Sequence, residues 1–236
     1  MWNEDAPQWV APGERAWSAS APTWGIWGVP DEECPLLPED MSGMTAIELG
    51  CGTGYVSAWM ARRGARVTGI DISEGQLATA RRLAGEHGID LNLVHGSAEE
   101  VPLPAGTFDF AVSEYGAALW CDPYVWLPEA HRLLRPGGGL SFLTNHPLAV
   151  VCSPIDGSEP IVDSLQRDYF GMHRQDWRDA VDEPGGIDFN LPISRWFALF
   201  EDTGFDVLSL YEPRPETGGS ETNFFVTADW VVRWPS

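Results

Sequence analysis

The sequence predicts an α/β fold in which helices cover both faces of a doubly wound, mostly parallel sheet of seven strands. Short apolar runs that suit buried strands alternate with helical segments from residue 45 onward. A glycine-rich turn, Gly50-Cys51-Gly52-Thr53-Gly54, follows the first of these strands, at the usual place of the first strand-to-helix connection. A strand, a helix and a strand near the C-terminus predict an antiparallel C-terminal edge strand.

The first part of the pattern contains two helices with clear start or stop signals. The segment 55–64 has apolar residues at helical spacing and ends at Gly64. Ser73 and Gln76 have the spacing of a capping box, which would begin the second helix. The elements predicted in this part are strand 45–49, helix 55–64, strand 65–71, helix 74–87 and strand 91–96.

The second part continues the alternation with a less regular helix. Pro128 would interrupt or start that helix, and the run RPGGG at 135–139 predicts a turn before the next strand. The elements predicted in this part are strand 108–114, helix 124–134, strand 140–145, helix 193–204, strand 205–213 and strand 222–231.

Two segments depart from this rhythm. Residues 1–43 contain five tryptophans among many prolines, which indicates a wrapping segment with a short helix or two that packs on the rest of the chain. Residues 44–236 form the main predicted domain. Within it, residues 146–191 are rich in proline, aspartate and glycine, and we interpret them as an inserted lid.

Composition narrows the class of protein. The 236 residues have a net charge of −21, which gives an unfavourable field for nucleic acid or an anionic membrane. The start of the chain does not look like a signal peptide, and no apolar run is long enough for a membrane span, so we expect a soluble cytoplasmic protein. The four cysteines form no CxxC pair, which argues against a zinc site and a disulfide framework. The sequence makes no prediction of oligomeric state.

The glycine turn predicts a ligand at the carboxyl ends of the strands. Glycine lets the chain turn sharply and lets a ligand touch main chain, and a helix N-terminus follows. Asp71 ends the second strand about 20 residues later, where a carboxylate accepts hydrogen bonds from ribose hydroxyls. The turn and the acid together favour an adenosine-type ligand over a tight turn without a ligand.

The glycine spacing argues against a nicotinamide cofactor. The dinucleotide pattern is G-x-G-x-x-G, whereas Gly54 comes one residue early in this chain. Glu48 lies two residues before the first glycine, and no Walker lysine is possible because the chain contains no lysine. An NAD-dependent oxidoreductase therefore stays only as a weaker alternative.

These residues resemble the motifs of class I S-adenosylmethionine-dependent methyltransferases, of the small-molecule type with a methyltransferase-11-like domain. AIELGCGTGYVSAWMARRGARVTGIDIS is similar to the first two motifs of that family, and VHGSAEEVPLPAGTFDFAVSE is similar to its third and fourth strands. EAHRLLRPGGGLSFLTNHP resembles the approach to its fifth strand, and RWFALFEDTGFDVLSLYEPRP matches more loosely. The resemblance implies a Rossmann-like sheet and an S-adenosylmethionine cofactor, with S-adenosylhomocysteine as the product.

The resemblance also implies which residues bind the cofactor. The glycine turn would pass under the methionine part, Asp71 would hold the ribose, and three residues after the third strand would face the adenine edge. Ser97 stands where the family often has aspartate, so that contact would lack its charge. The implied cofactor-binding residues are Glu48, Gly50, Cys51, Gly52, Gly54, Asp71, Ile72, Gln76, Ser97, Ala98, Glu99, Ser113 and Glu114.

Methyl transfer from a sulfonium requires mainly that two partners be held at attack distance in a dry site. A general base helps when the acceptor is a hydroxyl, and the candidates are His146 and Tyr115, which follow strands at the active edge. SEYG replaces the Asn-Pro-Pro-Tyr type of motif used on exocyclic or amide nitrogen, and no Asp-Asp-Asn cluster supports a metal site. We expect a small-molecule acceptor, methylated on oxygen, nitrogen or carbon. A non-catalytic protein that binds an adenosine cofactor is the alternative.

Overall fold

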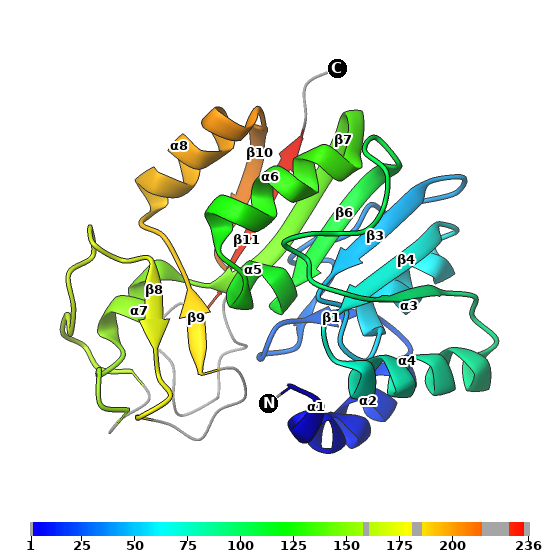
Figure 1. Ribbon diagram of the computed structural model, residues 1–236, viewed down its shortest axis with the longest axis horizontal. Coiled ribbons are helices and arrows are strands. Elements are labelled where there is room, and N and C mark those ends of the chain that lie inside the picture. The colour runs from blue at the N-terminus through cyan, green and yellow to red at the C-terminus, as the bar shows by residue number, and fades with distance from the viewer. Residues whose placement is uncertain (1, 158–160, 181–185, 214–226, 234–236) are drawn as a thin grey trace.

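The computed structural model describes residues 2–157, 161–180, 186–213 and 227–233 (Figure 1). A central sheet has the strand order β10-β11-β7-β6-β3-β4-β5. The strands β3 to β7 pair in parallel, and β11 is antiparallel to both of its neighbours. The strands of this sheet are β3 (Thr45–Leu49), β4 (Arg66–Asp71), β5 (Asn92–His95), β6 (Phe108–Glu114), β7 (Leu134–Asn145), β10 (Asp206–Tyr211) and β11 (Thr227–Arg233).

Helices pack on both faces of the sheet, as the alternation predicts. Successive residues of β3 point to opposite faces, so Ala46 joins one hydrophobic cluster and Ile47 the other. The cluster around Ile47 includes side chains of α5, α6 and α8, and the cluster around Ala46 includes side chains of α3. The helices of the main domain are α3 (Tyr55–Arg62), α4 (Glu74–His87), α5 (Gly116–Trp120), α6 (Pro123–Leu133), α7 (Pro147–Cys152) and α8 (Ile193–Thr203).

The structure confirms the doubly wound α/β class and corrects two details. The antiparallel strand β11 is not at the edge, because it lies between β10 and β7 and leaves β10 as the edge strand. Strand β7 begins at Leu134, so the RPGGG run belongs to the strand instead of a turn. The ladder with β6 starts at Leu134 opposite Phe108, and it resumes at Gly139 opposite Phe110 after a register shift. The first five residues of the predicted last strand, 222–226, lie outside the described residues.

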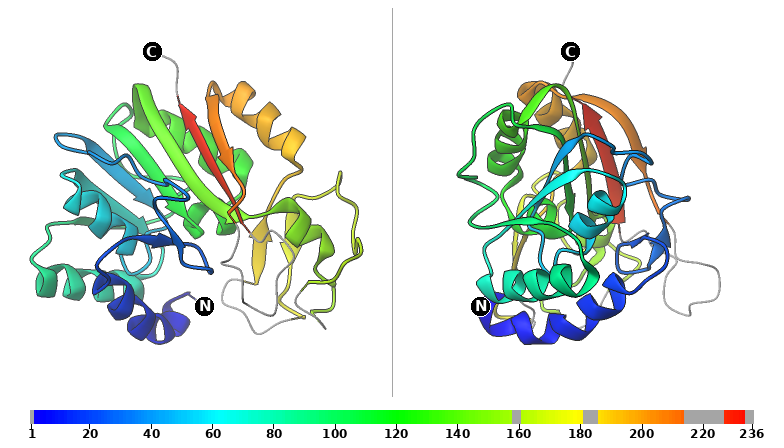
Figure 2. Two further views of the ribbon diagram at one scale, coloured as in Figure 1. Left: turned by 180° about the vertical axis from the view of Figure 1, so that it is seen from behind. Right: turned by 90° about the vertical axis from the view of Figure 1, so that its right-hand side faces the viewer.

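The N-terminal segment, residues 2–43, packs on the main domain. Trp17 and Trp24 are at most 1% exposed, which agrees with the expectation that the tryptophans here pack on something. Helices α1 and α2 contact α4, and Figure 2 shows them beneath it, at the end of the molecule where the central strands finish. The elements of this segment are α1 (Trp2–Asp5), the 3-10 helix η1 (Ala6–Trp9), α2 (Val10–Trp17), β1 (Thr23–Trp24) and β2 (Val29–Pro30).

The described part of the segment 146–191 lies at the same strand ends, on the side of β7 and α5. This part begins with α7 and continues to a short hairpin of β8 (Arg174–Asp176) and β9 (Ile187–Phe189). In Figure 1 this part lies next to α5 and away from α1 and α2. No helix in the described part of the chain has the length and apolar character needed to cross a membrane.

Candidate active site

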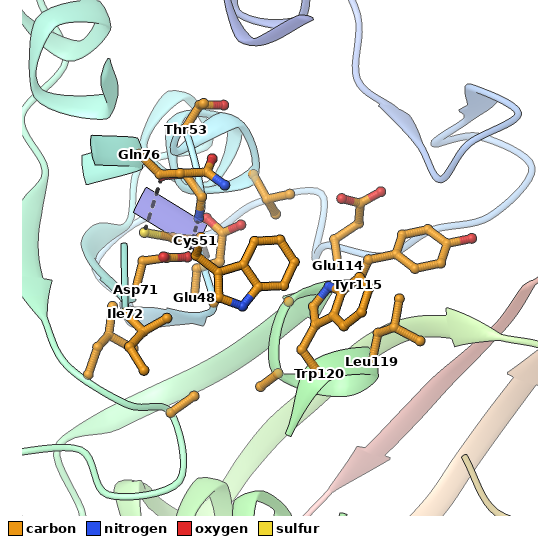
Figure 3. A pocket seen from close by; sticks show the side chains of 18 of the residues that line it. Glu48, Cys51, Thr53, Asp71, Ile72, Gln76, Glu114, Tyr115, Leu119 and Trp120 are labelled. Carbon is orange, nitrogen blue, oxygen red and sulfur yellow. Dashed lines mark hydrogen bonds between the residues drawn. The ribbon is translucent and has the colours of Figure 1, made fainter. Parts of the chain in front are cut away.

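A cavity of about 850 Å³ opens at the carboxyl ends of β3, β4 and β6. In Figure 3 its labelled side chains form two groups, with Asp71, Ile72, Cys51 and Gln76 on one side and Glu114, Tyr115, Leu119 and Trp120 on the other. The first group follows β3 and β4, and the second follows β6 and enters α5. Parallel strands therefore bring distant parts of the sequence to one site, as the switch point of such a sheet does.

The glycine turn adopts a backbone conformation that residues other than glycine adopt only with strain. Gly50, Gly52 and Gly54 have φ values of 78°, 51° and 77°, all in the left-handed region. A Cβ on Gly50 would also lie 2.7 Å from the backbone nitrogen of Ala117 and from Cα of Gly116. The turn after β3 and the turn after β6 thus touch through bare backbone, which explains the glycines at positions 50 and 116.

Most N–H groups of the turn are already used. The N–H groups of Gly50 and Cys51 donate to the carbonyl of Ile70, that of Gly52 donates to Asp71 Oδ2, and that of Gly54 donates to Cys51. Four of the five N–H groups in residues 50–54 therefore donate within the protein. A pyrophosphate needs such groups free, so the turn does not suit a dinucleotide and the weaker nicotinamide alternative loses its physical basis.

Asp71 lines the cavity and also supports its walls. Its Oδ2 accepts from Gly52 N at 2.8 Å, and its Oδ1 accepts from Ser73 N at 2.8 Å. Burial raises the pKa of this carboxyl, while the two backbone N–H groups oppose the increase. Each carboxylate oxygen keeps acceptor capacity for a ribose hydroxyl.

Glu48 is the most deeply buried acid in the cavity wall, with 3% of its surface exposed. Its Oε2 accepts from the backbone N–H and the hydroxyl of Ser57 in α3. Burial raises the pKa of Glu48 to about 8, the Ser57 bonds oppose that shift, and the charges of Glu114 and Asp71 add to it. A neighbouring positive charge would favour the ionised form of this carboxyl.

Glu114 and Tyr115 end β6 on the other side of the cavity. Glu114 Oε1 accepts from Gly25 N at 2.7 Å, and burial raises the pKa of the Glu114 carboxyl. Tyr115 has φ 54°, and it is the one non-glycine residue with positive φ in the described chain. Such a conformation costs of order 1–3 kcal/mol and is typical of functional sites.

The residues that the resemblance implies for adenine binding lie in the cavity wall after β4 and β5. Ile72 is 57% exposed, which leaves its side chain available to a flat ring. Glu99 Oε1 accepts from Asp122 N at 2.8 Å, so its carboxylate is tied to the start of α6. The other implied residues that line this cavity are Gly50, Cys51, Gly52, Gln76, Ser97 and Ala98.

The N-terminal segment supplies cavity residues that the sequence did not identify one by one. Trp2 and Trp9 line the cavity, and Trp2 meets Trp120 edge-on with ring centroids 4.9 Å apart. Asn3 Oδ1 accepts from Gly75 N and from the hydroxyl of Ser73, both at 3.0 Å. These bonds connect α1 to the start of α4, close to Asp71. The tryptophan-rich composition signalled packing but not this attachment.

Three expected site residues do not line the cavity. Gly54 is the N-cap residue of α3, and a Cβ there would lie 3.2 Å from Ala80 Cβ. Ser113 is fully buried, and its hydroxyl donates to Leu49 O and accepts from Ala118 N. Both residues hold the turns in place, outside the cavity lining.

His146 is the third, and its role as a general base stays a prediction that its placement does not support. The histidine is 2% exposed and caps α7, where its Nδ1 accepts from Leu148 N at 3.0 Å. Nδ1 therefore carries no proton, and Nε2 lies 2.7 Å from Glu212 Oε1. A histidine followed by proline after a strand is also a helix-start pattern, and His146 has that structural role here.

The charged side chains in the described cavity lining are all acidic. They are five carboxylates, and the described lining contains neither arginine nor histidine. The carboxylates belong to Glu48, Asp71, Glu99, Glu114 and Asp188. Within the described ranges, no three His, Cys, Asp or Glu side chains come together in a way that could hold a metal ion. From the described part of the segment 146–191, Asp188 alone reaches the cavity.

Comparison with known proteins agrees with this architecture. Residues 47–142 match the family described as a methyltransferase domain. The chain is 30% identical over 183 residues to a ubiquinone biosynthesis O-methyltransferase from Maricaulis maris, covering 72% of each chain. It is 33% identical over 181 residues to one from Aromatoleum aromaticum, covering 71% of this chain and 77% of the relative. The crystal structure of an S-adenosylmethionine-dependent methyltransferase from Mesorhizobium loti shares the fold, with a TM-score of 0.68, 24% identity, and coverage of 84% and 94%.

Proposed function

Because the chain belongs to the S-adenosylmethionine-dependent methyltransferases, we propose that its cavity holds the methyl group of this cofactor against a hydroxyl oxygen of a small, flat acceptor. The observation that carries the proposal is a single cavity, lined on one side by the glycine turn and Asp71 and on the other by Tyr115 and Trp120. The two O-methyltransferase relatives support oxygen as the acceptor atom. The net charge of −21 argues against a nucleic-acid acceptor.

The cofactor occupies the side of the cavity built by β3, β4 and β5. In this proposal Asp71 accepts from the ribose hydroxyls, and Ile72 packs on adenine beside Ser97 and Ala98. The amino-acid part runs along the glycine turn towards Glu48. The open ring-facing surface of Ile72 and the remaining acceptor capacity of Asp71 support this orientation. The methyl group then points towards the residues that follow β6.

The acceptor occupies the aromatic side. Tyr115 and Trp120 come from the turn after β6, and Trp2, Trp9 and Tyr55 complete the wall. Aromatic faces favour flat apolar rings and leave little room for water. Water exclusion matters because the transfer is an in-line displacement on an activated carbon, in which holding and drying the partners supplies most of the acceleration.

Tyr115 is the side chain proposed to orient the acceptor hydroxyl. It lines the cavity, and its strained backbone fixes it at the start of α5. His146 is not assigned a role in proton transfer, because it caps α7 away from the cavity.

The experiment is methyl transfer from labelled S-adenosylmethionine to matched phenols, anilines and benzoates, followed by mass spectrometry of the products. We expect methylated phenols, and Trp120→Ala should raise KM for the phenol about tenfold, corresponding to about 1.4 kcal/mol. Trp59→Ala is the control, because Trp59 lies on α3 outside the cavity lining. Methylation of anilines or benzoates alone would contradict the acceptor atom. Absence of any turnover with tight cofactor binding would favour a non-catalytic protein.

A further inference from the structure

The segment 146–191 contributes one side chain to the cavity, and that side chain is acidic. Among the described residues of the segment, Asp188 alone lines the cavity, and it is 8% exposed. Asp188 lies in β9, which contacts α5, the helix that brings Leu119 and Trp120 to the same cavity. The carboxylate therefore belongs to the aromatic side, where the acceptor is placed, and not to the glycine turn.

Contacts on either side of Asp188 hold β9 in this place. Within the hairpin, Asp188 is opposite Gln175 of β8, which is also buried. Two residues later, Asn190 is fully buried, and its Nδ2 donates to the backbone carbonyl of Asn145 at 2.6 Å. Asn145 ends β7 and lines the cavity as well. Buried bonds thus fix the position of Asp188 before any acceptor arrives, which lowers the cost of binding one.

The positive charge that acts on Asp188 comes from outside the cavity. It belongs to Arg167, which is not part of the described lining. One Arg167 nitrogen donates to Ser153 O at 2.9 Å, and the guanidinium lies 4.6 Å from the centre of the Trp177 ring. A cationic ligand can therefore reach Asp188 from the cavity without meeting an arginine or histidine of the described lining. A buried carboxylate favours such a ligand, because charge burial is costly unless the charges are paired.

We propose that Asp188 makes this cavity select phenolic acceptors that carry an ammonium group. The inference rests on the proposed function, which places a flat phenol against Tyr115 and Trp120. A carboxylate forms charge-assisted hydrogen bonds with ammonium, and the faces of tryptophan and tyrosine attract the same cation. A neutral phenol would desolvate Asp188 without offering it a cation, and an anionic phenol would be repelled. The net charge of −21 also draws small cations to the protein.

The pairing has a consequence for the acceptor atom. Asp188 stabilises the protonated amine, whose nitrogen has no lone pair and cannot attack the methyl group. The phenol oxygen can attack. It forms a bond to the methyl carbon, the carbon–sulfur bond breaks with its electron pair left on sulfur, and the hydroxyl proton is lost to solvent. Asp188 is thus a specificity-determining residue that favours oxygen over nitrogen within one acceptor.

The test is calorimetric titration of the full chain, saturated with S-adenosylhomocysteine, with three phenols of similar shape. Aminoethylphenol carries an ammonium group, propylphenol has a methyl group in its place, and hydroxyphenylpropanoate has a carboxylate; each is used as its meta and para isomers. We expect the wild type to bind one aminoethylphenol isomer about tenfold or more tightly than the matching propylphenol, and the propanoate most weakly. Asp188→Asn should reduce that preference about fivefold or more and leave propylphenol within about twofold.

Two controls make the result specific to the acceptor. Asp163→Asn removes the same charge from an exposed position of the same segment, outside the lining of this cavity, and should leave the preference within about twofold of the wild type. Binding of S-adenosylmethionine should also stay within about twofold in Asp188→Asn. A large loss there would mean that the carboxylate serves the cofactor, and it would overturn the inference.

Three further results would overturn it. These are equal binding of the matched aminoethylphenol and propylphenol by the wild type, no binding of either, and an unchanged preference in Asp188→Asn. In transfer assays, an equal fall of kcat for all phenols in Asp188→Asn would make Asp188 a proton acceptor instead. If this variant does not fold, as judged by circular dichroism, the wild-type comparison decides. Because the complex with S-adenosylhomocysteine has no methyl group to give, an ammonium preference without any transfer would contradict the proposed function alone.

Discussion

The cofactor wall and the N-terminal segment that covers it are built in opposite ways. The wall depends on backbone, with left-handed glycines in one turn and a carboxylate bonded to the N–H groups beside it. The N-terminal segment depends on side chains, such as Asn3, which reaches Gly75 across 72 positions in the sequence. Where backbone packs on backbone, the structure has no room to accommodate a larger side chain. Contacts made by side chains can instead be removed singly by substitution. We therefore expect large effects in the wall and small, separable effects in the segment.

The sharpest test of this contrast is Gly50→Ala. The added Cβ would lie 2.7 Å from backbone atoms of the turn after β6, at a φ of 78° that alanine resists. We expect a loss of roughly 3–5 kcal/mol in the free energy of unfolding, from overpacking and backbone strain together. Cofactor binding should fall below detection. Chemical denaturation and calorimetry measure both effects.

Gly43→Ala is the matched control for that variant. Gly43 has a φ of 79°, almost the same as Gly50, but nothing lies within 4 Å of its added Cβ. It should lose only about 1–2 kcal/mol, which is the cost of the left-handed conformation alone. Equal losses in the two variants would show that the contact between the two turns contributes nothing.

The next largest effect concerns pH and Glu48. Its pKa rises from 4.5 in the unfolded chain to about 8 in the folded protein, so the folded state binds more protons between these values. Ionisation of Glu48 therefore lowers the stability of the ligand-free protein as pH rises from about 5 to 8. Glu48→Gln removes this dependence, and its stability relative to the wild type should increase by roughly 1–4 kcal/mol over that range.

Thermal and urea denaturation at several pH values would measure the difference between Glu48→Gln and the wild type. Glu33→Gln serves as the comparison, since Glu33 is exposed and belongs to the N-terminal segment. A difference that stays flat with pH would mean that Glu48 is ionised in the empty cavity. Cofactor binding should also release a proton above pH 6, visible in calorimetry as a dependence on the ionisation enthalpy of the buffer.

The smallest expected effect is in the N-terminal segment. Asn3→Ala removes the acceptor for Gly75 N and the Ser73 hydroxyl, and it should cost about 1 kcal/mol of stability. If the segment closes over the bound cofactor, cofactor dissociation should accelerate several-fold in stopped-flow tryptophan fluorescence. Gln8→Ala, also exposed and in the same segment, should change neither quantity. Unchanged dissociation in Asn3→Ala would indicate that the segment only packs.

The same contrast explains what could be predicted from sequence. Strand β3, helix α4 and strand β6 were predicted at the residues observed, because their apolar periodicity and caps lie within the segment itself. Asp71 and the glycine turn were identifiable for the same reason, since they adjoin strands that are visible in the pattern. Both expectations depend only on local sequence.

The remainder depends on contacts between distant segments. The two-residue and three-residue strands β1, β2, β8 and β9 are too short to show periodicity. Helix α5 has as its N-cap a tyrosine with positive φ, which no propensity favours. The attachment of Asn3 to α4 requires knowledge of where the glycine turn places Asp71 and Ser73. The sequence could not reveal that His146 caps α7, because a helix cap and a catalytic base can use the same residue type after a strand.

Strand β11 has a consequence for the order in which the protein can be completed. It lies between β7 and β10, although it follows both in the chain. During translation, β10 leaves the ribosome before the strand that must join it to the sheet. Until β11 emerges, β7 presents the edge from Gly139 to Asn145 unpaired to any neighbouring nascent chain. A pause of the ribosome between residues 211 and 227 would therefore prolong the interval in which the chain can aggregate, and a chaperone that shields strand edges would act at this step.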